Sequence, residues 1–137
     1  MAKQQKAWMP KPAKISTTTI PDAIKLELET KAASLIETVL KPKHVVPQKS
    51  DIEFNYVSDI GTKWYRKYFY FFATYTCPGS NALSPSFESE FARMEYVGAG
   101  RFSLSFHRYT DEWIKPYAPL TVYGCLKAIK DDAWFTP

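Results

Sequence analysis

The chain has 137 residues, of which 45% are hydrophobic and 23% are charged. This length allows one domain with its own core, and this composition argues against a disordered chain. Aromatic residues are unusually frequent at 16%, with nine Tyr, nine Phe and four Trp. No motif identifies an activity, but the pattern of hydrophobic and aromatic residues predicts a fold and a candidate surface.

The net charge of +4 comes from one end of the chain. No acidic residue precedes Asp22, whereas four lysines do: Lys3, Lys6, Lys11 and Lys14. The other 14 of the 18 basic residues balance the 14 acidic ones. A neutral body argues against an electrostatic surface for nucleic acid, and therefore against nucleic acid as the main partner. We predict that residues 1–19 are a disordered basic tail and that residues 20–137 form a single domain.

The sequence also gives an expectation for the cellular compartment of the protein. The first twenty residues lack the apolar stretch of a secretory signal, and the densest apolar run, Tyr68–Ala73, is too short to span a bilayer. The two cysteines, Cys77 and Cys125, do not form a CxxC pair and do not suffice for a disulfide framework. We therefore expect a reduced, cytoplasmic protein without membrane association.

The first predicted element is a helix from Pro21 to about Leu40 or Lys41. Proline suits the first helical turn, where its missing N–H has no intrahelical partner to lose. The apolar stripe of this helix consists of Ile24, Leu28, Ala32, Leu35 and Val39, widened by Leu26, Ile36 and Leu40. We expect Pro42 to end the helix.

From Asp51 onward the hydrophobic period is two, which is typical of strands. The predicted strands are Asp51–Val57, the aromatic run Trp64–Thr76, Phe87–Val97, Arg101–Tyr109 and a short strand with Trp113 and Ile114. The predicted turns are Asp59–Thr62, Gly98–Gly100 and Thr110–Asp111, with a longer loop over residues 77–85.

A short helix is predicted at the end of the chain. Thr121 is a suitable N-cap, and the helix ends near Asp131. Its apolar face consists of Val122, Cys125, Leu126 and Ile129, and the apolar end at Trp134 and Phe135 is expected to fold back. The complete order predicts a two-layer α+β fold: an N-terminal helix, a four- or five-stranded antiparallel meander sheet and a short C-terminal helix.

Strand alternation separates the two faces of the predicted sheet. We assign Phe69, Phe71, Phe102, Leu104 and Phe106 to the face that the helices cover. Both helices fit on that side, so the opposite face is left open to water. The candidate binding residues on this open face are Arg66, Tyr68, Tyr70, Arg93, His107 and Tyr109.

Three interpretations of this aromatic face are considered. The simplest is structural, with the rings packed against the 77–86 loop and the C-terminal Trp134 and Phe135. The functional one is an interface for a homodimer or a protein partner, because Tyr, Trp and Arg are enriched at such contacts. The third is a platform on which single-stranded nucleic acid binds weakly, or on which a flat ligand stacks. The segment Gly100–Leu104 lacks the spacing of RNA-binding sheet motifs, which makes this third interpretation the weakest.

The sequence evidence for a catalytic site is weaker than the evidence for an aromatic binding face. His107 is the candidate general base of a small ribonuclease or hydrolase, with Glu112 as its partner. Alternation, however, puts Arg108 on the face opposite His107. We expect a binding protein without catalytic machinery. The alternative is a small pocket-forming enzyme or ligand-binding protein with its site around His107.

Metal and nucleotide motifs are also missing from the sequence. The His and Cys residues do not occur at metal-ligand spacing, and no glycine-rich phosphate loop is found. We expect no metal and no cofactor. Glu88 and Glu90 lie two apart, out of phase with Glu95, which is typical of a solvated edge strand.

Overall fold

The computed structural model describes residues 19–45, 54–79 and 84–137. The predicted tail, apart from its last residue, and the predicted start of the first strand at Asp51 lie outside these residues. The elements are α1 (Asp22–Leu35), η2 (Ile36–Leu40), α2 (Lys41–His44), β2 (Tyr56–Tyr65), β3 (Tyr68–Thr76), β4 (Ser86–Gly98), β5 (Arg101–His107), β6 (Trp113–Ile114), β7 (Leu120–Thr121), α3 (Val122–Asp131) and η3 (Ala133–Phe135). Within the described ranges, no helix has the length and apolarity needed to cross a membrane.

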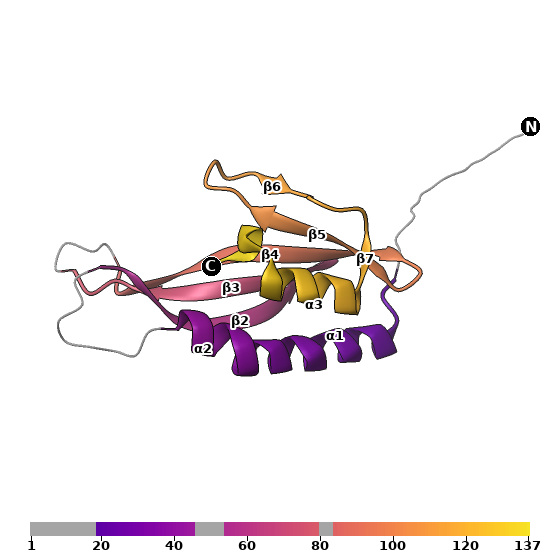
Figure 1. Cartoon of the computed structure of the whole chain (residues 1–137), viewed down its shortest axis with the longest axis horizontal. Coiled ribbons are helices and arrows are strands. Elements are labelled where there is room, and N and C mark those ends of the chain that lie inside the picture. Colours follow the sequence, from indigo (N-terminus) through magenta and orange to yellow (C-terminus); the bar gives the residue numbers. More distant parts are fainter. Residues whose placement is uncertain (1–18, 46–53, 80–83) are drawn as a thin grey trace, which may run out of the picture.

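The strands form one antiparallel sheet in the order β2-β3-β4-β5-β6, with β7 paired to the far end of β5. Each strand of this path neighbours the one before it in sequence, so the sheet is a meander. Helices α1 and α3 lie side by side in a second layer (Figure 1). The predicted two-layer α+β fold is confirmed.

One core fills the space between the helices and the sheet. Its fully buried side chains include Leu28 and Leu40 from the N-terminal helix, Phe69, Phe71, Met94, Phe102 and Leu104 from the strands, and Cys125 and Phe135 from the C-terminal end. The assignment of Phe69, Phe71, Phe102, Leu104 and Phe106 to the helix-covered face is therefore confirmed. The predicted helical stripe is also confirmed, except that Leu26 is 66% exposed.

Pro42 does not end the N-terminal helix, contrary to our prediction. The helix passes through a π-helical segment, η2, in which the Lys41 N–H donates to the Ile36 carbonyl five residues earlier. In a regular α-helix the proline ring would clash with the carbonyl of Thr38. The wider π-helical turn directly before Pro42 relieves that clash, so helix α2 continues to His44.

The predicted turn at Asp59–Thr62 is wrong, and so is the single strand predicted for Trp64–Thr76. Strand β2 runs through Gly61, and the hairpin turn lies at Arg66 and Lys67 instead. Arg66 supplies the reversal with a left-handed φ of 57°. Gly61 meets a different requirement, because the Phe72 ring of the neighbouring strand occupies the space of a Cβ there.

The C-terminal end folds back as predicted, and it packs on the helix side of the sheet. The Thr121 side chain caps α3 by accepting a hydrogen bond from the Gly124 N–H at 3.1 Å. Phe135 is buried, and the Trp134 ring stacks on Phe106 at 4.8 Å. Because Phe106 belongs to the helix-covered face, this C-terminal segment leaves the opposite face of the sheet uncovered.

Replacing Gly61 with alanine tests the close approach of β2 and β3. An alanine Cβ would lie 2.8 Å from Cζ of Phe72, so the ring must shift and stability falls by about 1–3 kcal/mol. Gly79→Ala is the control, since a Cβ there meets nothing within 4 Å. Urea unfolding measures both variants. Equal stability of Gly61→Ala and the control would contradict the packing described.

Candidate interaction surface

The second face of the sheet is the one turned away from α1 and α3. Strand pairing sets its rows of side chains: Tyr70 on β3 lies beside Arg93 on β4, and Arg93 lies beside Ser105 on β5. At the edge of the sheet, His107 on β5 pairs with Trp113 on β6. The face therefore carries aromatic rings on both sides of a central arginine.

Arg93 lies between two aromatic rings. Its guanidinium carbon is 4.6 Å from the ring centroids of both Tyr68 and Trp113. Tyr70 connects these two rings, with centroid distances of 5.9 Å to Tyr68 and 5.8 Å to Trp113. His107 extends the group by stacking on Trp113 at 4.6 Å with an interplanar angle of 13°. We call these five half-buried residues the aromatic–arginine cluster.

Two buried serines lie beneath the cluster. Arg93 on β4 and Trp113 on β6 touch each other, although β5 runs between their strands. Their side chains must meet above β5 at the level of Ser105, the cross-strand neighbour of Arg93. Ser105 is only 2% exposed and Ser103 only 7%. Small side chains at these positions leave the room that the arginine and the tryptophan need.

The structure brings together four of the six predicted binding residues, namely Tyr68, Tyr70, Arg93 and His107. Arg66 and Tyr109 do not join them. Arg66 lies in the β2–β3 turn with its guanidinium over Tyr65, and Tyr109 is 93% exposed because β5 ends at His107. Trp113, the fifth member of the cluster, was not among the predicted binding residues. Its place on a strand was predicted, but its pairing with His107 cannot be read from periodicity.

Glu88 and Glu90 lie on the part of β4 that has one strand neighbour. They pair with β3, whereas the pairing of β4 with β5 begins at Ala92, which agrees with our interpretation of a solvated edge. The pairing of β3 with β4 shifts its register between Phe71 and Phe72. Phe71 pairs with Ala92 and Phe72 pairs with Glu90, so Phe91 is the extra residue of a β-bulge. The bulge reverses the alternation, so both glutamates share the second face with Arg93.

Lysines engage the carboxylates of the second face. Lys63 on β2 reaches over the Phe72 ring to Glu88 at 3.2 Å and to Glu90 at 3.1 Å. Lys67 holds Glu95 at 2.8 Å. These hydrogen-bonded ion pairs raise the pKa of both lysines, with Glu90 as the largest cause for Lys63 and Glu95 for Lys67.

Arg93 has no such partner. Across residues 19–45, 54–79 and 84–137, no carboxylate forms a salt bridge with its guanidinium. Stacked aromatic faces leave the in-plane N–H groups of a guanidinium available. The second face therefore offers a half-buried cation that is held in place by rings and not by an anion of the described chain.

The geometry around His107 does not favour a general base. Its Nδ1 lies 3.2 Å from the Glu90 carbonyl oxygen and its Nε2 lies 2.8 Å from the Asp111 carboxylate, so both ring nitrogens already face acceptors. The adjoining hollow of about 510 Å³, lined in part by Ser89, Arg108 and Tyr109, is open to solvent. In the part of the chain that the structure describes, no three His, Cys, Asp or Glu side chains cluster as metal ligands would.

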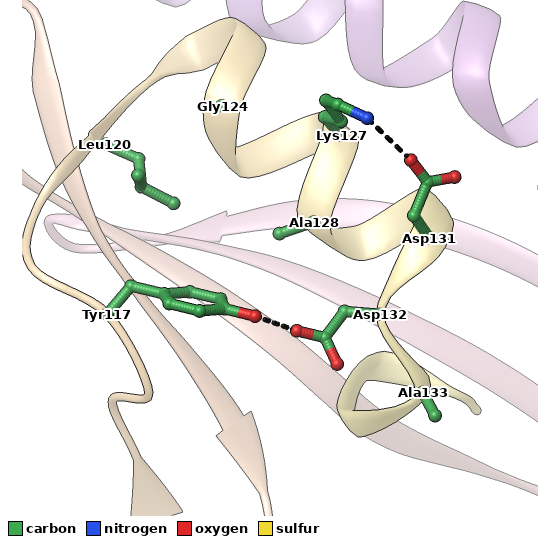
Figure 2. A pocket seen from close by; sticks show the side chains of 8 residues that line it. All are labelled: Tyr117, Leu120, Gly124, Lys127, Ala128, Asp131, Asp132 and Ala133. Atoms are coloured by element: carbon green, nitrogen blue, oxygen red, sulfur yellow. Dashed lines mark hydrogen bonds and ion pairs between the residues drawn. The ribbon is translucent and has the colours of Figure 1, made fainter.

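A second cavity of about 500 Å³ lies beside α3 (Figure 2). Tyr117 reaches toward α3 from the segment before β7, and its hydroxyl donates a hydrogen bond to Asp132. This bond raises the pKa of Tyr117. Lys127 is likewise held by Asp131 at 3.0 Å. The remaining lining is apolar or small: Leu120, Gly124, Ala128 and Ala133. The polar groups satisfy one another, so the cavity presents no arrangement for acid–base chemistry.

The fold and this surface define an α+β protein with an antiparallel meander sheet, helices on one face and an aromatic–arginine cluster on the other. Residues 20–137 match the family described as "Domain of unknown function (DUF3024)", and the protein belongs to that family. The comparisons with curated proteins and with solved structures gave no match.

A double-mutant cycle tests the stacking of Arg93 on Trp113. Arg93→Met and Trp113→Leu each remove one partner of this contact. We expect a coupling free energy of about 0.5–2 kcal/mol from urea unfolding, because the guanidinium and the ring are half-buried. The exposed pair Arg108 and Tyr109, 5.8 Å apart, is the control and is expected to show no measurable coupling. Additive effects at Arg93 and Trp113 would contradict the cluster.

Thiol reactivity tests the burial of Cys125. Burial against β5 raises the pKa of this thiol to about 12, so almost no thiolate forms near neutral pH. In a Cys77→Ser variant, we expect Ellman's reagent to leave the folded protein unlabelled and to label one thiol after denaturation. The rate of labelling in the wild type then reports on the half-buried Cys77. Rapid labelling of the folded variant would show that Cys125 is accessible.

Proposed function

We propose that the protein acts by binding another polypeptide, a second copy or a different protein, on the second face of its sheet. The observation that carries this proposal is the aromatic–arginine cluster, which is half-buried on a face that no described helix covers. Tyr, Trp and Arg are the residues whose contacts contribute most to protein interfaces. The cluster combines all three around Arg93, which has no described carboxylate partner.

The order within the cluster supports binding. Trp113 contacts three other members of the cluster, Arg93, Tyr70 and His107, so its ring is fixed before any partner arrives. Side chains that are already ordered lose less conformational entropy on association than free ones do. The cluster therefore has the properties of an anchor, whereas the exposed Tyr109 and Arg66 do not.

The two alternative functions have less support. Three carboxylates lie on the second face, at Glu88, Glu90 and Glu95, and they would repel the phosphates of a nucleic acid. A pocket enzyme around His107 needs a ring nitrogen that is free to exchange a proton, and both nitrogens face acceptors of the chain itself. Binding of a polypeptide meets neither difficulty.

Site-specific photocrosslinking tests the proposed function. A benzoyl-phenylalanine at Tyr70 places the reactive group inside the cluster, and the same group at Tyr123 is the control. Tyr123 is 70% exposed on α3, in the helical layer. In cells that naturally express the protein, we expect a discrete crosslinked product from position 70 and none from position 123. That product contains either two copies of the chain or one copy and another protein.

The same experiment can overturn the proposal. If irradiation yields no product from position 70, or equal products from both positions, the second face is not a specific binding surface. The urea-unfolding midpoint of the labelled protein shows whether the group at position 70 leaves the fold intact.

A further inference from the structure

The unbalanced charges on the second face lie at two sites along strand β4, since Lys67 neutralises Glu95 there. At one site, the single ammonium of Lys63 is shared by two carboxylates, Glu88 and Glu90, which leaves one surplus negative charge. At the other site, Arg93 is positive and has no described carboxylate partner. The bulge at Phe91 puts both sites on the same face. The face is thus positive at one point and negative at another.

Two copies of such a face complement each other about a two-fold axis. In a two-fold interface, if residue i contacts residue j of the other copy, then j also contacts i. An axis that passes between the two sites brings each Arg93 onto the Lys63–Glu88–Glu90 group of the other copy. Three to five residues separate the sites along β4, or about 10–16 Å at ~3.3 Å per residue. Both contacts therefore fit within one interface.

The size and the net charge of the molecule also suit a second copy. The strands β2 to β6 have 10, 9, 13, 7 and 2 residues. At about 3.3 Å per residue and about 4.8 Å between strands, they give a face of roughly 650 Å². Two such faces bury roughly 1,300 Å², which exceeds the ~1,000 Å² expected of a specific interface. Outside the lysines at the start of the chain, acidic and basic residues balance, so the bodies of two copies do not repel each other.

We propose that the second face binds a second copy of the chain as a two-fold homodimer, in which Arg93 of each copy binds the carboxylate of Glu88 or Glu90 of the other. The rings of Tyr70 and Trp113 lie beside these contacts and are excluded from water in the dimer. This proposal rests on the proposed function and specifies its partner.

A charge exchange between two variants tests this contact. Arg93→Glu turns the positive site negative, and Glu90→Lys turns the surplus negative charge of the other site positive. In a dimer of two copies of the same variant, like charges then face each other at both contacts. In a mixed dimer, however, the carboxylate introduced by Arg93→Glu faces the positive site of the Glu90→Lys copy. The native Arg93 of that copy faces native Glu88 and Glu90. Of the three dimers that the two variants can form, only the mixed dimer therefore has opposite charges at both contacts.

Light scattering and sedimentation equilibrium on the full chain measure the outcome. We expect the wild type to have twice the 15.8 kDa mass of the chain. For each variant alone, the dissociation constant should rise about tenfold or more, because like charges face each other at two places. An equimolar mixture of the variants should regain most of the wild-type affinity. Arg108→Glu, outside the second face, is the control and should remain dimeric.

Folding defects can be separated from interface defects. Circular dichroism and urea unfolding show whether each variant keeps its fold. If Arg93→Glu does not fold, Arg93→Met removes the charge without reversing it, and its dimer should be weaker than that of the wild type. Recovery in the mixture cannot arise from a variant that is unfolded, so the mixture distinguishes the proposed contact from a structural role of Arg93.

The contrary outcomes separate this inference from the proposed function. A wild type that stays monomeric up to high micromolar concentration overturns the homodimer. In that case, a crosslink from position 70 to another protein keeps the second face as a binding surface. A dimer that persists in both charge variants also overturns the proposed contact. If position 70 then gives no crosslink either, the proposed function fails as well.

Discussion

The β-bulge at Phe91 is the constraint on which the arrangement of both faces depends. A regular strand alternates strictly, so Glu88 and Glu90 would point to one side of the sheet and Arg93 to the other. The extra residue lets Phe91 and Ala92 both be buried on the helix side. The same local change sends the two glutamates and the arginine to the second face. One backbone irregularity thus fills the core and also creates the charge pattern outside it.

The distribution of helix explains why a second face exists. A five-strand meander has two broad faces, and both helical segments of the described chain pack on the one that contains Phe69 and Phe102. The aromatic pair at the C-terminal end, Trp134 and Phe135, packs on that face too. Among the described residues, it is the long side chains of the second face itself that shield it. Arg93, Tyr70 and Trp113 extend across neighbouring strands, which accounts for the burial of Ser103 and Ser105 beneath them.

Features that depend on local periodicity were predictable from the sequence. The helical stripe, the strands on either side of Gly98, and the N-cap at Thr121 all follow from residue spacing or from a single side chain. Strand alternation also placed Phe102 and Phe106 on the helix side, because no bulge interrupts β5. Within one uninterrupted element, the pattern of residues decides the structure.

The missed features depend on relations between elements. The β2–β3 turn contains no Gly, Asn or Asp, so nothing in its sequence indicates that Arg66 adopts a positive φ. Gly61 suggested a turn, yet its role is to admit the Phe72 ring from the next strand. Four cluster members were predicted because they alternate correctly, whereas Trp113 joins them only through the register of β6 with β5.

The use of lysine and arginine on the second face follows from their different chemistry. An ammonium is compact and strongly hydrated, which suits the ion pairs of Lys63 and Lys67 near water. A guanidinium is planar and weakly hydrated, so it can lie between Tyr68 and Trp113 and still keep its edge donors available. Lysine at position 93 would lose this stacking geometry. The half-buried cation of the cluster is therefore the one best suited to exchange water for a carboxylate.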